Sequence, residues 1–307
     1  MEGPDMAVRA VVVGSLNMDL VFRVPHRPET DDVVIATDFA TYRGGKGYNQ
    51  AVALARLGAE VAMVGAVGAD AHGDQMRRAL THEGVDTTGL VELAQQSTGV
   101  AVPLVTPDGE VAFVQHPGAN RHLGPQACDD LPACDLLLLQ GEVPAPTSQA
   151  AAERIAARGG LVVLNPAPVG AIGPELVELA DVVVPNRVEA RDLARRLGID
   201  AAAPNAPTLA ARLARGDRRA VITLGARGAA WAAGGAHGLI SSPEIAAVDA
   251  TGSGDSFTAA LAVALAEGAD LVSATEFACA AGAHAATVAG AEPGLPLRAH
   301  VQALLSG

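Results

Sequence analysis

Short apolar runs alternate with alanine-rich helical stretches along most of the chain. Six runs are continuously apolar rather than alternating, which suits strands covered on both faces; they lie at residues 10–13, 61–64, 136–139, 161–164, 182–184 and 220–224. Helix candidates follow them at residues 49–57, 73–83, 148–158, 189–197, 209–215 and 255–267. The repeated order of strand and helix predicts an α/β fold with a mostly parallel sheet and helices on both sides.

Two stretches break this rhythm. Residues 21–39 alternate apolar and polar positions without a helical pattern, and residues 98–115 read as two strands around the turn TPDG at 106–109. These strands form either a small separate sheet or the edge of the main sheet, and the pattern alone does not decide between them. The alanine- and proline-rich residues 201–207 are expected to form a surface loop.

Composition narrows the class of protein. The chain has 307 residues, of which 50% are hydrophobic and 18% charged, enough for a large core in one domain or two closely joined ones. Its formal net charge is -13 and the acidic residues are scattered, which argues against nucleic acid as a partner. The cysteines at 128, 134 and 279 have no CxxC spacing, so neither a disulfide framework nor a zinc site is expected.

No apolar run reaches the roughly 20 residues that a membrane span needs. Residues 1–9 also lack the basic start and apolar core of a signal peptide. We therefore expect a cytoplasmic protein without a membrane partner.

Polar residues follow several of the expected strands. In an open parallel sheet, ligands bind outside the carboxyl ends of the strands, so these positions are candidates for a site. They include Asn17 and Asp19 after the first strand, Glu142 after the 136–139 strand, Asn186 and Glu189 after the 182–184 strand, and Gly225 and Gly228 after the last. Each alone is better explained by a turn or a helix cap, and it is their shared edge that favours a site.

The stretch RGGKGYNQA at residues 43–51 precedes an apolar helical pattern. Its glycines allow the backbone to approach a ligand closely, and Lys46 and Asn49 are spaced to face the same way at a helix start. A helix cap with a solvent-exposed lysine is the alternative. Neither the Walker A pattern nor the dinucleotide-binding GxGxxG pattern is present, so phosphate binding would use another device.

A second glycine-rich stretch, DATGSGD, occupies residues 249–255. Apolar Phe257, Leu261 and Leu265 follow at helical spacing, so a helix begins at about Gly254. Its free amides and the positive end of its dipole form an anion site. Asp255 would then face a hydroxyl that loses its proton while the amides hold the phosphoryl group under attack. Alternatively, Asp255 only complements the helix dipole.

Together these motifs resemble the ribokinase-like family of carbohydrate kinases. The match extends from Val11 to about Leu297, and its most specific parts are GGKGYNQA at 44–51 and DATGSGD at 249–255. Supporting motifs, in the family's order, are GSLNMD at 14–19, STGVA at 97–101, HPGAN at 116–120, LNPAP at 164–168, PNRVE at 185–189 and TLGARG at 223–228. The resemblance implies a single three-layer α/β/α domain over residues 1–307, with a small β-sheet lid formed by insertions at about 17–43 and 97–118.

The resemblance further implies an ATP-dependent kinase for the primary hydroxyl of a pentose, most simply ribose at O5. Asp255 would be the catalytic base, and Gly252, Ser253 and Gly254 would offer amides to the phosphoryl group. The positions that match sugar-binding residues are Asn17, Asp19, Gly45, Lys46, Asn49, Glu142 and Asp255. Those that match ATP-binding residues are Asn186, Thr223, Gly225, Gly228 and Gly254, with Glu189 linked to Mg²⁺.

A monovalent cation site, for K⁺, also follows from the resemblance. Its ligands would be Asp249 and the backbone carbonyls of Thr251, Ala285, Val288 and Gly290. Lids of this kind commonly pair between two chains, so the resemblance implies a homodimer.

Three positions depart from the family's pattern. Tyr48 replaces a small alanine beside the expected sugar-binding residues, so we expect it to reshape the sugar pocket. Cys279 stands where a histidine or asparagine commonly lines the adenine site, which bears on nucleotide affinity. Gly294 replaces a serine and removes one potential oxygen from the cation site.

Other functions remain open at this point. A close variant is a kinase for 2-deoxyribose, another sugar or a nucleoside. A catalytically silent sugar- or nucleotide-binding regulator on the same fold belongs to a different class. Asp255, the glycines before it and Glu189 all favour a kinase over that regulator. A nicotinamide-dependent oxidoreductase is disfavoured because the glycine fingerprint is missing.

Overall fold

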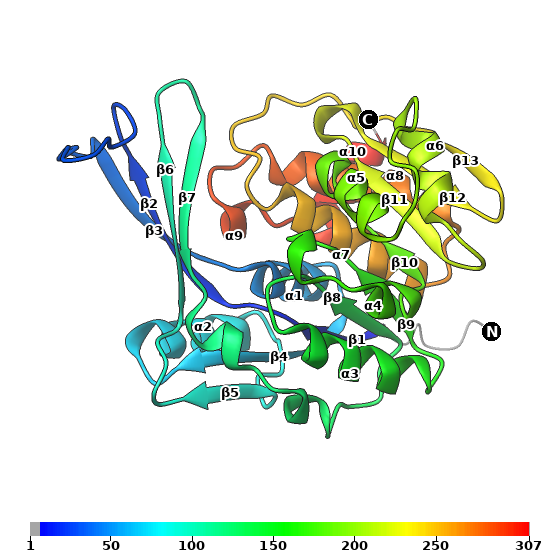
Figure 1. Cartoon of the computed structure of the whole chain (residues 1–307), viewed down its shortest axis with the longest axis horizontal. Coiled ribbons are helices and arrows are strands. Elements are labelled where there is room, and N and C mark those ends of the chain that lie inside the picture. Colours follow the sequence, from blue (N-terminus) through cyan, green and yellow to red (C-terminus); the bar gives the residue numbers. More distant parts are fainter. Residues whose placement is uncertain (1–6, 307) are drawn as a thin grey trace.

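The structure is a computed structural model that describes residues 7–306 (Figure 1). Most of the 1–9 segment, which we expect not to be a signal peptide, lies outside these residues. Among the helices of residues 7–306, none combines the length and the apolarity that crossing a membrane requires.

Within residues 7–306 the main sheet has nine strands, in the order β13-β12-β11-β10-β9-β8-β1-β4-β5. Seven of them run parallel: β1 (Arg9–Val13), β4 (Glu60–Gly68), β5 (Leu90–Leu93), β8 (Leu136–Leu139), β9 (Leu161–Leu164), β10 (Val182–Val183) and β11 (Arg219–Thr223). An antiparallel hairpin, β12 (Ala229–Ala233) and β13 (Ala236–Ile240), completes one edge. The prediction of a mostly parallel sheet is confirmed.

Helices cover both faces of this sheet (Figure 1). One apolar cluster contains side chains of α1 (Lys46–Arg56), α2 (Ala71–His82), α7 (Ser253–Ala266), α8 (Leu271–Ala285) and α10 (Arg298–Ser306). The other contains side chains of α3 (Ala145–Ala156), α4 (Pro174–Glu178), α5 (Arg187–Arg196) and α6 (Ala206–Leu213). Successive residues of β1 alternate between the two clusters, because side chains along a strand point to opposite faces. This is the expected three-layer α/β/α arrangement.

A second, four-stranded sheet projects from one end of the molecule (Figure 1). It consists of β3 (Asp38–Gly44), β2 (Asn17–Arg23), β6 (Gly99–Val105) and β7 (Val111–His116), in that order. The β2 and β6 strands pair in parallel and the other pairs are antiparallel. The two irregular stretches therefore form a separate small sheet, not edge strands of the main one.

The helix starts, one loop boundary and several unpredicted elements differ from the sequence prediction. Each expected helix begins two or three residues earlier than its apolar pattern suggested. The expected 201–207 loop is too long at its C-terminal end, because Asn205 caps α6 and the helix begins at Ala206, with Pro207 in its first turn. The sequence analysis did not identify β5, the β12–β13 hairpin, α4, α8, α10 or the short helix α9 (Ala291–Gly294).

Candidate active site

The start of α1 packs directly against the junction of β1 and β2. Gly45, the residue before α1, has a φ of 91°, and a Cβ there would lie 2.8 Å from the backbone nitrogen of Asn17. A Cβ on Gly47 would lie 2.5 Å from the backbone nitrogen of Ser15. The glycines of this motif therefore allow the helix start, with Lys46, to lie against the carboxyl end of the first strand.

Two amide side chains of α1 hold the carboxylate of Asp255. Asn49 Nδ2 donates to Asp255 Oδ2 at 2.9 Å, and Gln50 Nε2 donates to Asp255 Oδ1 at 3.0 Å. Gln140, at the end of β8, donates in turn to Gln50 Oε1 at 2.7 Å, and Gln50 also reaches Asn165 Oδ1 at 3.3 Å. All five side chains are buried, so the carboxylate is held within a buried amide network.

The parts of Gln50, Gln140 and Asn165 in this network were not predicted from the motifs. Gln50 lies inside the GGKGYNQA motif and Gln140 follows a predicted strand, so both carried a weak signal. Gln50 bonds Asp255 directly, whereas Gln140 and Asn165 bond Gln50, and each of these contacts joins residues distant in sequence. Only the folded chain identifies them as neighbours.

Burial and the neighbouring side chains shift the pKa of Asp255 in opposite directions. Burial raises the pKa of Asp255 above its ordinary value, while Lys46 and the two amide donors act in the opposite direction. Burial also lowers the pKa of Lys46, but the negative charges of Asp255 and Glu142 outweigh it and raise that pKa. Lys46 is therefore charged beside the carboxylate.

Two further carboxylates lie in the same region. Glu142 Oε2 accepts hydrogen bonds from the Lys46 backbone N–H at 3.1 Å and from Ser15 Oγ. The Asp19 carboxylate rests on Gly44, where a Cβ would approach Asp19 Oδ2 to 2.4 Å. Burial, with the charges of Glu142 and Asp255, raises the pKa of Asp19 to about 7.

Asn17 is held in place by Asn120, another residue that the sequence analysis did not single out. Asn120 Nδ2 donates to Asn17 Oδ1 at 2.9 Å and to the Leu16 carbonyl at 3.0 Å, while Asn120 Oδ1 accepts from the Leu16 N–H at 2.9 Å. Asn120 belongs to the HPGAN stretch, which contributed to the family resemblance. It fixes the orientation of Asn17 from below the small sheet.

The expectation that Tyr48 reshapes a sugar pocket is wrong. Tyr48 is fully buried and packs in the apolar cluster under α1. It lies two positions after Lys46, so the two side chains leave nearly opposite sides of the helix. Its ring lies near Arg43 and Glu292 instead, and burial, followed by the Glu292 charge, raises the pKa of Tyr48.

The start of α7 is an open helix terminus lined by small residues. Gly252 precedes the helix with a φ of 79°, in the left-handed region. The Ser253 N–H donates to the Ala250 carbonyl at 3.2 Å, and the Ser253 hydroxyl is buried without a hydrogen-bond partner among the described residues. Gly254 follows, and Asp255 lies in the first turn of the helix.

A cavity of about 520 Å³ adjoins the start of α7, where Gly254 lines it. Besides Gly254, its lining includes three expected ATP-binding positions, Thr223, Gly225 and Gly228. It also includes Cys279, which departs from the family's pattern. Gly228 has a φ of 86°, and a Cβ there would lie 1.9 Å from the Ile240 carbonyl oxygen, so only glycine fits. Burial raises the pKa of Cys279 to about 12, so its thiol is neutral.

Asn186 and Glu189 sit at the same sheet edge but outside the lining of that cavity. Asn186 bridges to Thr223 and caps α5, its Oδ1 accepting from the Glu189 N–H at 2.9 Å. Glu189 Oε2 accepts from the Asn186 N–H at 2.8 Å, which completes a capping box. Burial raises the pKa of Glu189.

The expected cation ligands lie on two segments, 249–251 and 285–290, which hydrogen bonds join. Asp249 Oδ1 accepts from the Thr251 N–H at 2.9 Å, and Asp249 Oδ2 accepts from the Gly290 N–H at 2.8 Å. Partial burial raises the pKa of Asp249, but the hydrogen bonds outweigh this effect and hold the pKa below its ordinary value. Ala285 ends α8, and a Cβ on Gly294 would lie 2.7 Å from the Ala285 carbonyl oxygen.

Solved structures of other proteins share this fold. A ribokinase from Thermotoga maritima aligns with a TM-score of 0.89 and 30% identity, over 98% of this chain and 100% of that one. Arabidopsis thaliana ribokinase, solved in complex with ribose and ATP, aligns with a TM-score of 0.85 and 30% identity, over 98% and 100%. The fold is therefore the ribokinase fold.

Sequence comparison gives the family. Residues 8–298 match the model of the pfkB family of carbohydrate kinases. Ribokinase of Bacillus subtilis is 37% identical over 299 residues, which is 96% of this chain and 98% of that protein. The chain belongs to the pfkB family of carbohydrate kinases, and it is an ATP-dependent carbohydrate kinase by that membership.

Proposed function

We propose that the protein transfers the γ-phosphoryl group of ATP to O5 of D-ribose. One observation carries this proposal: buried Asp255, held by two amide donors, lies between the polar cluster around Lys46 and the cavity that Gly254 lines. A base at that junction reaches both an acceptor hydroxyl and a phosphoryl group. The relatives described above, named as ribokinases and in one case solved with ribose and ATP, support ribose as the acceptor.

The sugar would lie in the polar cluster at the base of the small sheet. Carboxylates and amides accept and donate hydrogen bonds to hydroxyl groups, so the cluster suits a polyhydroxylated ligand. Its proposed ligands are Asn17, Asp19, Gly45, Lys46, Asn49 and Glu142. The small sheet would act as a lid that excludes water, which otherwise competes for the phosphoryl group.

The chemical step needs one proton transfer and one in-line displacement. Asp255 would take the proton of the O5 hydroxyl as O5 forms its bond to the γ-phosphorus and the bond to the ADP oxygen breaks. The amides of Gly252 and Gly254, with the positive end of the α7 dipole, would stabilise the transferring group. Because the Ser253 N–H already donates to Ala250, we assign Ser253 a role through its buried, unpartnered hydroxyl.

ATP would occupy the 520 Å³ cavity, with its base near Cys279 and its phosphates toward Gly254. Thr223, Gly225 and Gly228 line that cavity, and Asn186 neighbours Thr223. A bound Mg²⁺ would neutralise the phosphate oxygens, and Glu189, a half-buried carboxylate at the same sheet edge, is the residue that we assign to it.

We assign a monovalent cation, K⁺, to the loop around Asp249. The donor set fits, since it offers one carboxylate and the carbonyl oxygens of Thr251, Ala285, Val288 and Gly290. The α7 and α8 helices form a hairpin, so the C-terminal end of α8 lies near the N-terminal end of α7. The carbonyls that end α8 favour a cation there, while the amides that start α7 favour the phosphoryl group.

We place the protein in the cytoplasm, where ATP is supplied. We also propose that the small sheet carries a dimer contact. Phe39 and Val114 are 52% and 64% exposed on the same sheet. An exposed apolar sheet face favours pairing with a second copy of itself.

The proposal is tested by ADP release with a panel of pentoses, 2-deoxyribose and nucleosides, with and without K⁺. Ribose should give the highest kcat/KM. Asp255→Asn should lower kcat at least about 100-fold, the range for a lost general base, and leave ribose binding measurable by calorimetry. Asp270→Asn is the matched control, because Asp270 caps α8 and asparagine caps equally well. Near-normal kcat in Asp255→Asn would remove the assigned base, and tight ribose binding without ADP release would indicate a regulator.

A further inference from the structure

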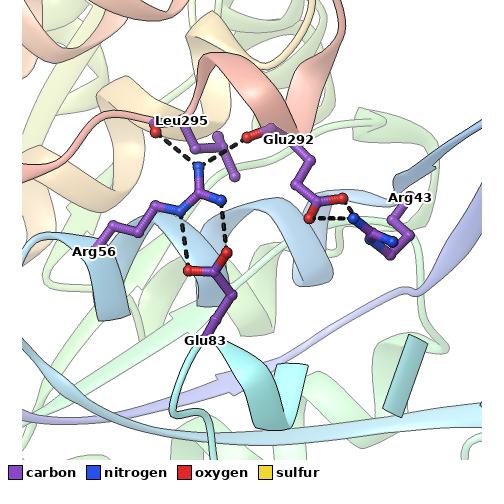
Figure 2. A network of polar contacts seen from close by, with 5 residues as sticks. All are labelled: Arg43, Arg56, Glu83, Glu292 and Leu295. Carbon is purple, nitrogen blue, oxygen red and sulfur yellow. Dashed lines mark hydrogen bonds and ion pairs between the residues drawn. The ribbon is translucent and has the colours of Figure 1, made fainter. Parts of the chain in front are cut away.

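An ion pair joins the small sheet to the loop that follows α8. Arg43 Nε donates to Glu292 Oε2 at 2.6 Å, and a second guanidinium nitrogen donates to Glu292 Oε1 at 2.7 Å (Figure 2). The two residues are 249 positions apart in the sequence. The Glu292 side chain is 10% exposed and that of Arg43 33%, so this is a two-point, largely buried contact and not a surface pair.

The Arg43 end of this pair neighbours the proposed sugar-binding residues along the backbone of β3, with its side chain on the sheet face opposite to Asp19. In the register of β2 and β3, Asn17 lies opposite Gly44, Met18 opposite Arg43 and Asp19 opposite Tyr42. Arg43 is also separated from Gly45, the residue before α1, only by Gly44. A shift of β3 along or away from β2 would therefore move the ion pair and the sugar cluster together.

The Glu292 end lies next to the proposed cation loop. Glu292 is two residues after Gly290, whose N–H donates to Asp249 Oδ2. Gly290 also packs under the ring of Tyr42, where a Cβ would lie 2.8 Å from the ring. Two neighbouring residues of β3 thus contact two positions of the 290–292 segment.

A second arginine fixes the far side of α9. Arg56, at the end of α1, donates to the carbonyls of Glu292 and Leu295, both at 2.9 Å, and pairs with Glu83 through two hydrogen bonds (Figure 2). The α9 segment is therefore held between α1, which carries proposed sugar-binding residues, and β3, which is a strand of the proposed lid. Breaking either contact leaves a charge poorly compensated, which opposes independent movement.

We propose that the Arg43–Glu292 pair couples the sugar site to the cation loop at residues 285–290. This inference rests on the proposed function, since it deepens the roles assigned to those two sites. Arg43 and Glu292 are positioning residues in this account, because they touch neither the sugar nor the phosphoryl group. Sugar binding orders β3, the ion pair transmits that order to α9, and the cation loop gains affinity; linkage makes the effect reciprocal.

The test uses the intact protein and two readouts besides turnover. Hydrogen exchange of the segment 285–294 is measured with and without ribose, and the ribose Kd is measured by calorimetry with K⁺ or with choline. In the unmodified protein, ribose should slow exchange in that segment, and K⁺ should tighten ribose binding about fivefold or more, the lower range of site-to-site coupling. Glu292→Gln should bring both effects close to zero.

Glu83→Gln is the matched control. It removes the carboxylate of another two-point pair, at 18% exposure, from the residue that follows α2, and it does not remove the Arg56 donors to the Glu292 and Leu295 carbonyls. Its unfolding temperature should fall as that of Glu292→Gln does, whereas both coupling effects should persist. The double variant Arg43→Met with Glu292→Gln removes both charges, so it tests the coupling without an unpaired buried ion.

Four results would overturn the inference. Undiminished coupling in Glu292→Gln or in the double variant would show that the pair does not transmit it. An equal loss in Glu83→Gln would show a general effect of lower stability. A lack of ribose binding by the unmodified protein would overturn the proposed function and this inference with it, whereas ribose binding without any K⁺ effect would leave the ribose assignment and remove the cation coupling.

Discussion

Asp255 depends on its neighbours for the protonation state that a base requires. Burial raises the pKa of its carboxyl, whereas the Lys46 charge and the hydrogen bonds from Asn49 and Gln50 oppose that rise. Gln50 is itself oriented by Gln140, which donates to its carbonyl oxygen. The amide network thus sets both the direction and the acidity of the carboxylate.

Replacing Gln50 by Met, which is similar in size, removes one donor from Asp255. A hydrogen bond to a charged group contributes about 1.5–3 kcal/mol, so the pKa of Asp255 should rise by about one to two units. A base works only when deprotonated, so the acid limb of kcat against pH should move upward by that amount. Gln149→Met, on α3, is the control, and an unshifted limb in Gln50→Met would contradict the role of the network.

We expect Asp19, a proposed sugar-binding residue, to make sugar binding depend on pH. Its pKa is raised to about 7, and only the ionised carboxylate accepts two hydroxyl hydrogen bonds. Ribose affinity should therefore increase as pH rises to about 7 and level off above it, as measured by calorimetry from pH 5.5 to 8.5, about one to two units on either side of that pKa. In the free protein, stability should fall over the rise from pH 3.8 to about 7, because the fold favours the neutral form.

Asp19→Asn is the variant that isolates this titration. It should weaken ribose binding at every pH and remove the slope below pH 7, since the amide does not ionise. Asp86→Asn, in an exposed turn that caps Thr88, serves as the control. A slope that survives in Asp19→Asn would assign the titration to another group.

At the scale of elements, α1 separates two environments along its length. Lys46 and Asn49 face the polar cluster, whereas Tyr48 faces Arg43 and Glu292 inside the core. The Tyr48 hydroxyl is buried without a hydrogen-bond partner among the described residues. An unsatisfied hydroxyl costs stability, so its removal should not be harmful.

Tyr48→Phe tests this placement. The KM for ribose and kcat should stay within about twofold of the unmodified protein, because the phenol lies outside the sugar cluster, and the unfolding temperature should be equal or higher. Asn49→Ala, a change one position along the same helix, should instead weaken ribose binding. A large change of KM in Tyr48→Phe would restore Tyr48 to the pocket.

Elements with strong apolar patterns were predictable, and alanine-rich ones were not. Six of the seven parallel strands were visible as continuous apolar runs, and only β5 was missed. The α8 helix is rich in alanine and buried on most sides, so its sequence shows no amphipathic stripe. The β12 and β13 strands have the composition AAWAA and AHGLI, with weak strand propensity despite the Gly-Gly turn between them.

The motifs could place the candidate site at one sheet edge, but not the contacts within it. Asn120, Gln140 and Asn165 act on residues distant in sequence, and nothing local distinguishes such a contact from a turn. The side chain direction of Tyr48 depended on where helix α1 begins, which the apolar pattern put three residues late. Tertiary packing, not propensity, decides these features.

At the scale of the whole molecule, the small sheet has an apolar face that the main body leaves exposed. Phe22 pairs with Phe39 across β2 and β3, with ring centroids 4.8 Å apart. The register places Leu104 and Val114 on that same face, opposite to the face of Asp19. Covering such a face removes apolar area from water, and a second copy of the sheet is the partner of matching shape.

The protein should sediment at twice the chain mass of 30.8 kDa, and Phe39→Asp should shift it to the single-chain mass, because a buried charge on that face lacks a partner. Leu239→Asp is the control, since Leu239 is 59% exposed on β13 at the far edge of the main sheet. Light scattering at several concentrations measures both variants. A Phe39→Asp protein that keeps the double mass would place the contact elsewhere, and a single-chain mass for the unmodified protein would exclude the dimer.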